Sequence, residues 1–210
     1  MSAVEKPLFI TFEGGEGSGK STQIKLLYQE LMVREIPVGI TREPGGSEGA
    51  EEIRELIVNG DKGRWDAWSE TLLVWAARRD HVEKVIKPAL ARGSWVLCDR
   101  FFDSTFAYQG YAGGLPTGDL QRLREMVIGD FGPSKTIFFD IDPALGLERT
   151  VERGLESEGR FESFDLTFHQ RLHDGFKELA RREPERIVTI DASQSVEAIQ
   201  REVLKAVGLH

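Results

Sequence analysis

The chain has 210 residues and a net charge of −8, and its hydrophobic content of 40% and charged content of 30% are typical of a globular protein. No apolar run approaches the roughly 20 residues of a membrane helix, and an acidic chain is poorly suited to nonspecific nucleic-acid binding. The single cysteine, Cys98, excludes an internal disulfide and a cysteine zinc cluster, and the N-terminal MSAVEKP lacks the features of a secretion signal, so we expect a cytoplasmic protein without membrane or nucleic-acid partners.

The first predicted elements are a strand, a glycine-rich loop and a helix. Residues 8–12 are apolar, β-branched or aromatic, which predicts a buried strand, and residues 24–31 carry apolar side chains at helical spacing. Between them, GGEGSGKS at 14–21 fits the phosphate-binding pattern G-x-x-x-x-G-K-[ST]. In this context backbone N–H groups and the helix start surround phosphate oxygens, Lys20 reaches the β- and γ-phosphates, and the Ser21 hydroxyl binds Mg²⁺. The alternative, a glycine-rich turn with a chance lysine, is disfavoured by the flanking elements.

This loop predicts a nucleoside triphosphate site. The predicted triphosphate-binding residues are Gly14, Gly15, Glu16, Gly17, Ser18, Gly19, Lys20, Ser21 and Thr22. The glycines allow close approach of the backbone to the phosphates, because they have no Cβ atoms to clash.

The next segment predicts a short strand at 38–41 that runs into the turn Arg42-Glu43-Pro44-Gly45-Gly46. Open α/β sheets bind ligands at the carboxyl ends of their strands, which makes this turn a candidate site segment. Helices are predicted at about 48–58 and 69–92, the second with an apolar stripe in its later half. Pro88 should kink the second helix or end its first part.

A third strand, at 95–98, ends at Asp99 and Arg100. An apolar strand that delivers an aspartate to the sheet edge suggests a second phosphate and magnesium element, with Asp99 as metal ligand. The alternative is an ordinary aspartate of a strand-end turn. A glycine-rich loop is predicted from Tyr108 to Gly118, before a helix at about 119–128.

The remaining segments continue the alternation of strands and helices. Strands are predicted at 136–139 and 187–190, and helices from Pro143 to Gly154, at about 166–182 and at about 196–207. The charged residues 155–162 predict a mobile loop, part of a lid at about 149–163. We therefore expect an α/β fold: residues 1–210 form one three-layer P-loop NTPase domain, with a parallel five-stranded sheet and helices on both faces.

Several classes of protein use a P-loop, and the sequence separates them. A regulatory GTPase needs Asn-Lys-x-Asp and Asp-x-x-Gly motifs, but the only asparagine is Asn59, followed by Gly60, and no Asp-x-x-Gly occurs. A motor would need a second module to move. A small-molecule kinase needs cations on several loops, because both reacting phosphate groups are anionic. Arginines near the predicted site supply them: Arg42, Arg54, Arg78, Arg100, Arg149, Arg153 and Arg160.

Four segments together resemble bacterial thymidylate kinase: FEGGEGSGKST, TREPGG, AARRDHVEKVIKPAL and LCDRFFDSTFAYQGYAGG. The resemblance covers nearly the whole chain, including GDFGPSKTIFFDID, and TREPGG with DRFFDSTFAYQG is specific to that family. It implies transfer of the γ-phosphoryl group of ATP to dTMP, with Mg²⁺, by a homodimer. Kinases of another pyrimidine monophosphate, and a nucleotide-dependent binding switch, remain alternatives.

The resemblance also implies residue roles. Arg42, Arg54 and Arg100 look like the clamp on the dTMP phosphate, Glu16 like the acid that holds the sugar 3′-hydroxyl, and Tyr108 like the ring under the sugar. Arg78, Thr105 and Gln109 look like the hydrogen-bonding set for thymine. The implied dTMP-binding residues are Glu16, Arg42, Glu43, Pro44, Arg54, Val74, Arg78, Arg100, Ser104, Thr105, Tyr108 and Gln109.

Position 74 departs from the usual pattern of the family, and position 17 indicates which class of the family the chain resembles. The family usually has a phenylalanine that stacks on thymine where this chain has Val74, and the aromatic here is the neighbouring Trp75. One class of the family has an arginine directly after the acid of the P-loop, but here that residue is Gly17. The chain therefore resembles the class with basic residues in the lid, which implies Arg153 and Arg160 as catalytic cations beside Lys20, Arg100 and Glu16. Ion pairs with nearby glutamates are the alternative for these arginines.

Overall fold

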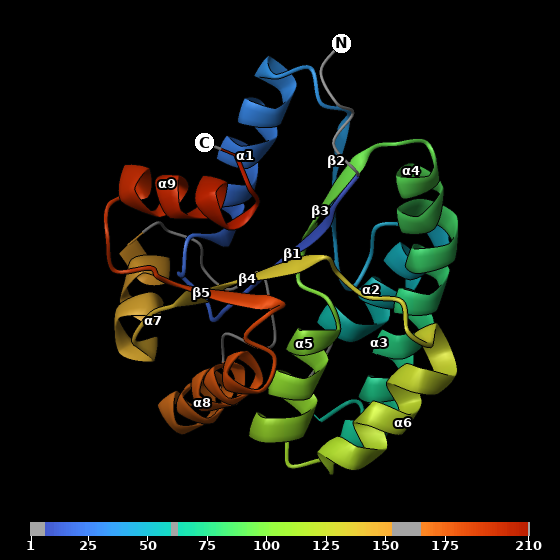
Figure 1. The fold of residues 1–210 in the computed structure, drawn as a ribbon. Coiled ribbons are helices and arrows are strands. Elements are labelled where there is room, and N and C mark those ends of the chain that lie inside the picture. Colours follow the sequence, from blue (N-terminus) through green and yellow to red (C-terminus); the bar gives the residue numbers. More distant parts are fainter. Residues whose placement is uncertain (1–6, 60–62, 153–164, 210) are drawn as a thin grey trace.

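One parallel sheet forms the centre of the molecule. The computed structural model describes residues 7–59, 63–152 and 165–209. The strands are β1 (Phe9–Glu13), β2 (Val38–Arg42), β3 (Trp95–Asp99), β4 (Lys135–Asp140) and β5 (Ile187–Asp191). They pair in the order β2-β3-β1-β4-β5, all parallel (Figure 1). The five-stranded parallel sheet predicted from the sequence is confirmed.

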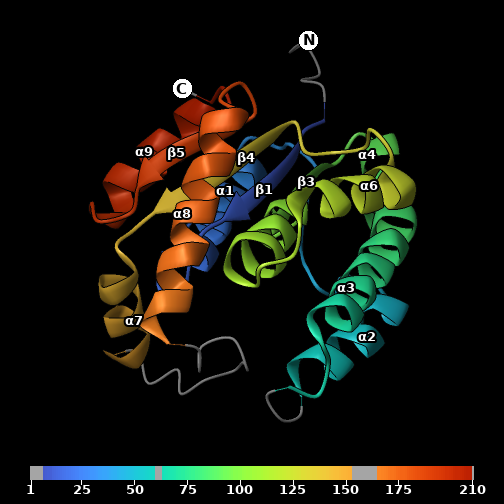
Figure 2. The same cartoon turned by 90° about the horizontal axis from the view of Figure 1, so that it is seen from below.

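Helices cover both faces of this sheet. They are α1 (Lys20–Val33), α2 (Glu48–Val58), α3 (Ala67–His81), η1 (Val82–Ile86), α4 (Lys87–Ala91), α5 (Phe102–Thr105), η2 (Phe106–Ala112), α6 (Thr117–Ile128), α7 (Pro143–Glu152), α8 (Leu166–Arg182) and α9 (Val196–Ala206), where η denotes a π-helical segment. Helices α1 and α9 lie on one side, and α5 and α8 lie on the other (Figure 1). Helices α2 and α3 run side by side (Figure 2). None of the helices within the described residues is long and apolar enough to cross a membrane.

The alternation of side chains along β1 divides the core in two. Phe9 belongs to the cluster that contains residues of α3, α5, α6 and α8, whereas Ile10 and Phe12 pack with residues of α1 and α9. This is the period of two expected of a strand with both faces covered. Glu13, the last residue of β1, follows Phe9 and Thr11 in this alternation, and its carboxylate contacts α5.

Two helical segments differ from the sequence prediction. The helix predicted over 69–92 begins at Ala67 and stops being α-helical after His81, where η1 precedes Pro88 in α4. The loop predicted from Tyr108 to Gly118 was wrong in its first part: residues 106–112 continue α5 as the π-helix η2, and residues 113–116 lie outside the helices. The reason is packing, because Phe106, Ala107 and Ala112 are buried in the core. Gly110 allows a close approach to α6, since a Cβ there would lie 3.0 Å from Leu120 Cδ1.

The register of the strands brings the predicted site segments together. Phe12 of β1 and Arg42 of β2 both lie opposite Asp99 of β3. The P-loop, the turn after β2 and the turn after β3 therefore meet at the carboxyl edge of the sheet, as is usual for ligand sites in open α/β folds.

Candidate active site

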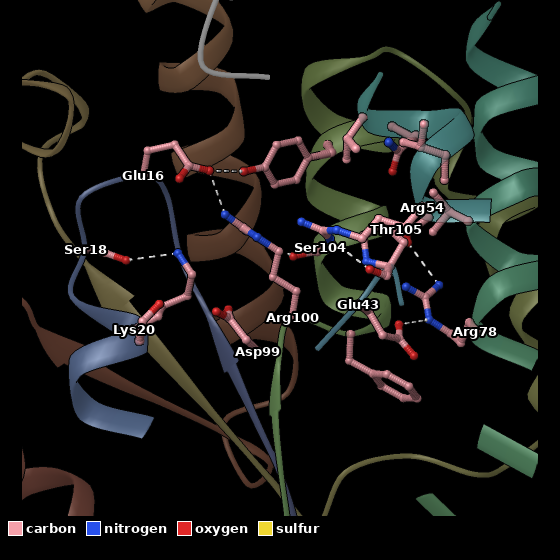
Figure 3. Close-up of a pocket in the computed structure, with 18 of the residues that line it drawn as sticks. Glu16, Ser18, Lys20, Glu43, Arg54, Arg78, Asp99, Arg100, Ser104 and Thr105 are labelled. Carbon is pink, nitrogen blue, oxygen red and sulfur yellow. Dashed lines mark hydrogen bonds and ion pairs between the residues drawn. The ribbon is translucent and has the colours of Figure 1, made fainter. Parts of the chain in front are cut away.

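A cavity of about 360 Å³ opens at this edge of the sheet (Figure 3). Most of the predicted site residues line it: Glu16, Gly17, Ser18, Gly19, Lys20, Ser21, Thr22, Glu43, Pro44, Arg54, Val74, Arg78, Asp99, Arg100, Ser104, Thr105, Tyr108 and Gln109. The sequence analysis missed four lining residues, which are Ile57, Val58, Phe101 and Thr150. Apolar residues at a helix end and a lone threonine gave no signal of facing a ligand.

Lys20 occupies the centre of the P-loop. Its Nζ donates hydrogen bonds to the carbonyl oxygens of Gly14, at 3.0 Å, and Gly15, at 2.8 Å. Ser18 Oγ lies 3.3 Å from the same nitrogen (Figure 3). Burial disfavours the charged amine and lowers the pKa of Lys20. The loop therefore holds one cation at the start of α1, where the helix dipole also favours an anion.

Gly17 has no room for a side chain. Its φ of 68° lies in the left-handed region, and a Cβ atom would lie 1.9 Å from the carbonyl oxygen of Gly146 in α7. Conversely, a Cβ at Gly146 would lie 2.4 Å from the carbonyl oxygen of Glu16. An arginine at position 17 would therefore require α7 to move, which gives a physical reason for the glycine found there.

Arg100 joins the turn after β3 to the P-loop. Its Nη2 donates to Glu16 Oε1 at 2.7 Å (Figure 3). Its Nη1 donates to the Gly14 carbonyl oxygen at 3.1 Å. Tyr108 lies under the guanidinium, 5.1 Å from ring centroid to Cζ, and its hydroxyl donates to Glu16 Oε1 at 3.2 Å. Burial favours the neutral form of Glu16, but Arg100 and Lys20 outweigh it and lower the pKa of this carboxyl. The cluster keeps an ionised acid beside the P-loop.

The buried carboxyl of Glu13 holds the Arg100 turn. Arg100 has a φ of 66°, a left-handed conformation that costs an L-residue about 1–2 kcal/mol. Glu13 Oε1 accepts from the Phe101 N–H at 2.8 Å, directly after the turn, and Oε2 accepts from Ser104 Oγ. Burial, together with the charge of Asp103, raises the pKa of Glu13 to about 8. Glu13 therefore stabilises a turn that the backbone alone disfavours.

Asp99 and Ser21 lie on the same cavity next to the P-loop. Asp99 Oδ1 is buried and has no hydrogen-bond partner within the described part of the chain. Those residues contain no group of three or more histidine, cysteine or acidic side chains that could hold a metal ion together. Mg²⁺ usually binds through one or two carboxylates together with substrate phosphates and water, so an unpartnered carboxylate and a hydroxyl fit this ion.

At the opposite end of the cavity, Arg78 is fixed on several sides. Its Nε donates to Glu43 Oε2 at 2.7 Å and its Nη1 to Thr105 Oγ1 at 3.0 Å (Figure 3). Trp75 packs on the guanidinium, with 4.4 Å between Cζ and the ring centroid, and is only 1% exposed. Val74, not Trp75, is the cavity-lining residue of this pair. The indole therefore supports the arginine and does not replace the missing phenylalanine.

Other predicted cations have different positions. Arg42 is not among the lining residues, and its Nη2 lies 3.1 Å from Glu51 Oε2. Arg54 lines the cavity and donates to the Pro44 carbonyl oxygen at 2.8 Å. Arg149 donates to the Ala192 carbonyl oxygen at 2.9 Å. The predicted lid residues Arg153 and Arg160 lie outside the described residues.

The fold and the cavity define a P-loop phosphotransferase, because a triphosphate-binding loop and a group of arginines line one cavity. The family model for thymidylate kinase matches residues 12–203. A thymidylate kinase of Caulobacter vibrioides is 53% identical over 191 residues, 91% of each chain, and one of Nitrobacter hamburgensis is 50% identical over 91% of this chain and 84% of its own. The crystal structure of thymidylate kinase from Ehrlichia chaffeensis superposes with a TM-score of 0.76 at 36% identity, covering 96% of this chain and 98% of that one. The chain belongs to the thymidylate kinase family.

The raised pKa of Glu13 predicts a pH-dependent contribution to stability. Between the ordinary value of 4.5 and about 8, the folded protein keeps a proton on Glu13 that the unfolded chain releases. This contribution is therefore present at low pH and is lost as the pH rises through that interval. Glu13→Gln should remove it, so the fall in Tm between about pH 5 and about pH 9 should be smaller in the variant than in the wild type.

Glu30→Gln, which alters a surface carboxylate paired with Arg34, is the control and should follow the wild-type pH profile. Thermal unfolding followed by circular dichroism measures all three proteins. Parallel Tm profiles for the wild type and Glu13→Gln would contradict the assignment of this titration to Glu13.

Proposed function

We propose that this protein transfers the γ-phosphoryl group of ATP to dTMP and releases dTDP and ADP. The observation that carries the proposal is that the P-loop and a pocket lined by Arg54, Arg78 and Arg100 belong to one cavity. The family membership supports thymidylate as the acceptor. Reactions of this kind depend on positioning and charge more than on covalent chemistry by the protein.

In the proposed reaction, an oxygen of the dTMP phosphate attacks the γ-phosphorus of ATP. A new phosphorus–oxygen bond forms as the bond from the γ-phosphorus to the bridging oxygen of ADP breaks. Lys20 leaves its carbonyl partners for the phosphates of ATP, while Arg54 and Arg100 hold the dTMP phosphate by forked hydrogen bonds. Arg42 would have to leave Glu51 before it could join them.

The sugar and the metal use residues between these two ends. Glu16 accepts from the 3′-hydroxyl, and the Tyr108 ring packs under the sugar. Ser21 and Asp99 are the residues that would hold Mg²⁺, which neutralises the phosphate charge when it is bound. We also propose a cytoplasmic location, where ATP is available. The reducing conditions there suit Cys98, a single buried cysteine that forms no disulfide.

A homodimer is the proposed assembly, with its interface on α3 and α6. Arg79 of α3 donates to the Val127 carbonyl oxygen of α6 at 2.8 Å, so the two helices adjoin. They carry exposed apolar side chains, with Trp68 39%, Leu72 55% and Met126 81% exposed. Exposed apolar groups gathered on neighbouring elements are typical of a surface that another subunit covers.

The substrate preference tests the proposal. Among dTMP, dUMP, dCMP and dGMP, dTMP should give the highest kcat/KM in a coupled assay of ADP release. Arg78 and Gln109 match a pyrimidine with carbonyl groups, which disfavours dCMP and dGMP, and the family membership favours dTMP over dUMP. A preference for dCMP, or ADP release that needs no monophosphate, would show that the assignment is wrong.

The valine at position 74 suggests that an aromatic substitution there can increase the affinity for dTMP. Val74→Phe should place an aromatic ring on the base and tighten dTMP binding by roughly 0.5–1.5 kcal/mol, the usual increment for an aromatic pair. Titration calorimetry measures this change, and the affinity for ATP should stay constant as the internal control. Weaker dTMP binding by the variant would mean that the pocket has no space for the ring.

The lid arginines should supply catalytic charge, since position 17 has no room for a side chain. Arg153→Ala or Arg160→Ala should lower kcat by roughly 10²-fold, the scale for loss of a transition-state contact. The Tm should hardly change, because surface ion pairs contribute little stability. Arg181→Ala, at an arginine 73% exposed on α8 and outside the proposed dimer surface, is the control. Near-native kcat in both lid variants would place the catalytic cation elsewhere.

The dimer surface can be disrupted by charge. Leu72→Glu and Met126→Glu should convert a particle of twice the 23.6 kDa chain mass into a monomer, as measured by light scattering. Val151→Glu, at an apolar residue 79% exposed on α7, should leave the mass of the particle unchanged. A wild-type monomer at micromolar concentration, or loss of the dimer in the Val151 variant alone, would exclude this interface.

A further inference from the structure

Glu70 is a buried acid that does not line the cavity but contacts a residue that does. It lies in the first turn of α3 and is 5% exposed. Its Oε1 accepts a hydrogen bond from Gln109 Nε2 at 2.9 Å. Gln109 comes from η2 and lines the cavity. This bond thus joins two helical segments that are far apart in sequence.

The hydrogen bond to Glu70 fixes the orientation of the Gln109 side-chain amide. Because Glu70 Oε1 accepts from Gln109 Nε2, the NH₂ end of the amide faces the carboxyl group. The amide oxygen is then the opposite end, and it accepts no hydrogen bond from any described residue. Glu70 therefore turns Gln109 so that an acceptor, and not a donor, is available to a ligand.

Arg78 supplies the complementary group on the neighbouring wall. Glu43 accepts from its Nε and Thr105 from its Nη1, which leaves Nη2 as the donor available to the cavity. Trp75 and Phe101 pack on the guanidinium, with 4.4 Å and 5.2 Å between Cζ and the ring centroids, and restrict its rotation. The pocket thus offers one fixed donor and one fixed acceptor.

We propose that Glu70 is a positioning residue for base selection, which makes the pocket select pyrimidines with a 4-oxo group and a protonated N3. This inference rests on the proposed function and on the base lying against Arg78 and Gln109. Thymine accepts at O4 and donates from N3–H, which matches a donor from Arg78 and an acceptor from Gln109. Cytosine has the opposite pattern, an amino group at C4 and an unprotonated N3, and leaves both protein groups unsatisfied.

The test uses Glu70→Gln, a substitution of equal size that can accept or donate. The amide of Gln109 is then free to reverse, so discrimination at N3 should be lost. We expect the ratio of the inhibition constant of dCMP to the KM of dTMP to fall roughly tenfold, with kcat nearly unchanged. The ratio of kcat/KM for dTMP to that for dUMP should stay at the wild-type value, because uracil and thymine share the same hydrogen-bonding edge.

Gln109→Leu and the double variant show whether Glu70 acts through Gln109. The single Gln109→Leu change should lower discrimination against dCMP to a similar extent, and adding Glu70→Gln should have little further effect. An unchanged dCMP ratio in a Glu70→Gln protein with native Tm would overturn the inference, as would additive effects in the double variant. A wild-type enzyme that does not prefer dTMP to dCMP would instead overturn the proposed function, and the inference with it.

Discussion

The left-handed turn at Arg100 is the constraint on which the rest of the site depends. It directs one guanidinium from the end of β3 across to the P-loop, where it meets Glu16 and the Gly14 carbonyl oxygen. The unfavourable conformation persists because a buried carboxyl, Glu13, accepts from the next backbone N–H. The P-loop and the turn after β3 are therefore held at a fixed separation.

Buried acids also orient other side chains around the cavity. Glu43 holds Arg78, and Glu70 holds the amide of Gln109. Buried ionic and polar pairs of this kind contribute little net stability, because desolvation offsets their attraction, but they fix direction well. A net charge of −8 in a protein that binds anions is understandable in these terms. Some acids orient the groups that meet the ligand, and short-range geometry prevails over the overall charge.

The sequence predicted most of the fold and many of the residues that line the cavity, for physical reasons that also explain the errors. The five strands and the P-loop follow from local patterns, since buried parallel strands are short apolar runs and the loop needs its glycines. The segment from Tyr108 looked like a loop because glycines normally break helices, but packing against α6 favours Gly110 there. Glu13 and Glu70 were not identified, because a glutamate beside a strand or in a helix start has no sequence signal for burial. Only the tertiary contact distinguishes them from surface acids.

We propose that Arg100 contacts the phosphate of the acceptor nucleotide, and a comparison of dTMP binding with thymidine binding tests this contact. Thymidine keeps the base and the sugar but lacks the phosphate. Calorimetric titration of the wild type and of Arg100→Lys with both ligands isolates the coupling between this side chain and the phosphate. We expect the substitution to weaken dTMP binding by about tenfold or more and thymidine binding by less than about twofold, because lysine lacks the forked donor geometry. Equal losses for the two ligands would contradict it.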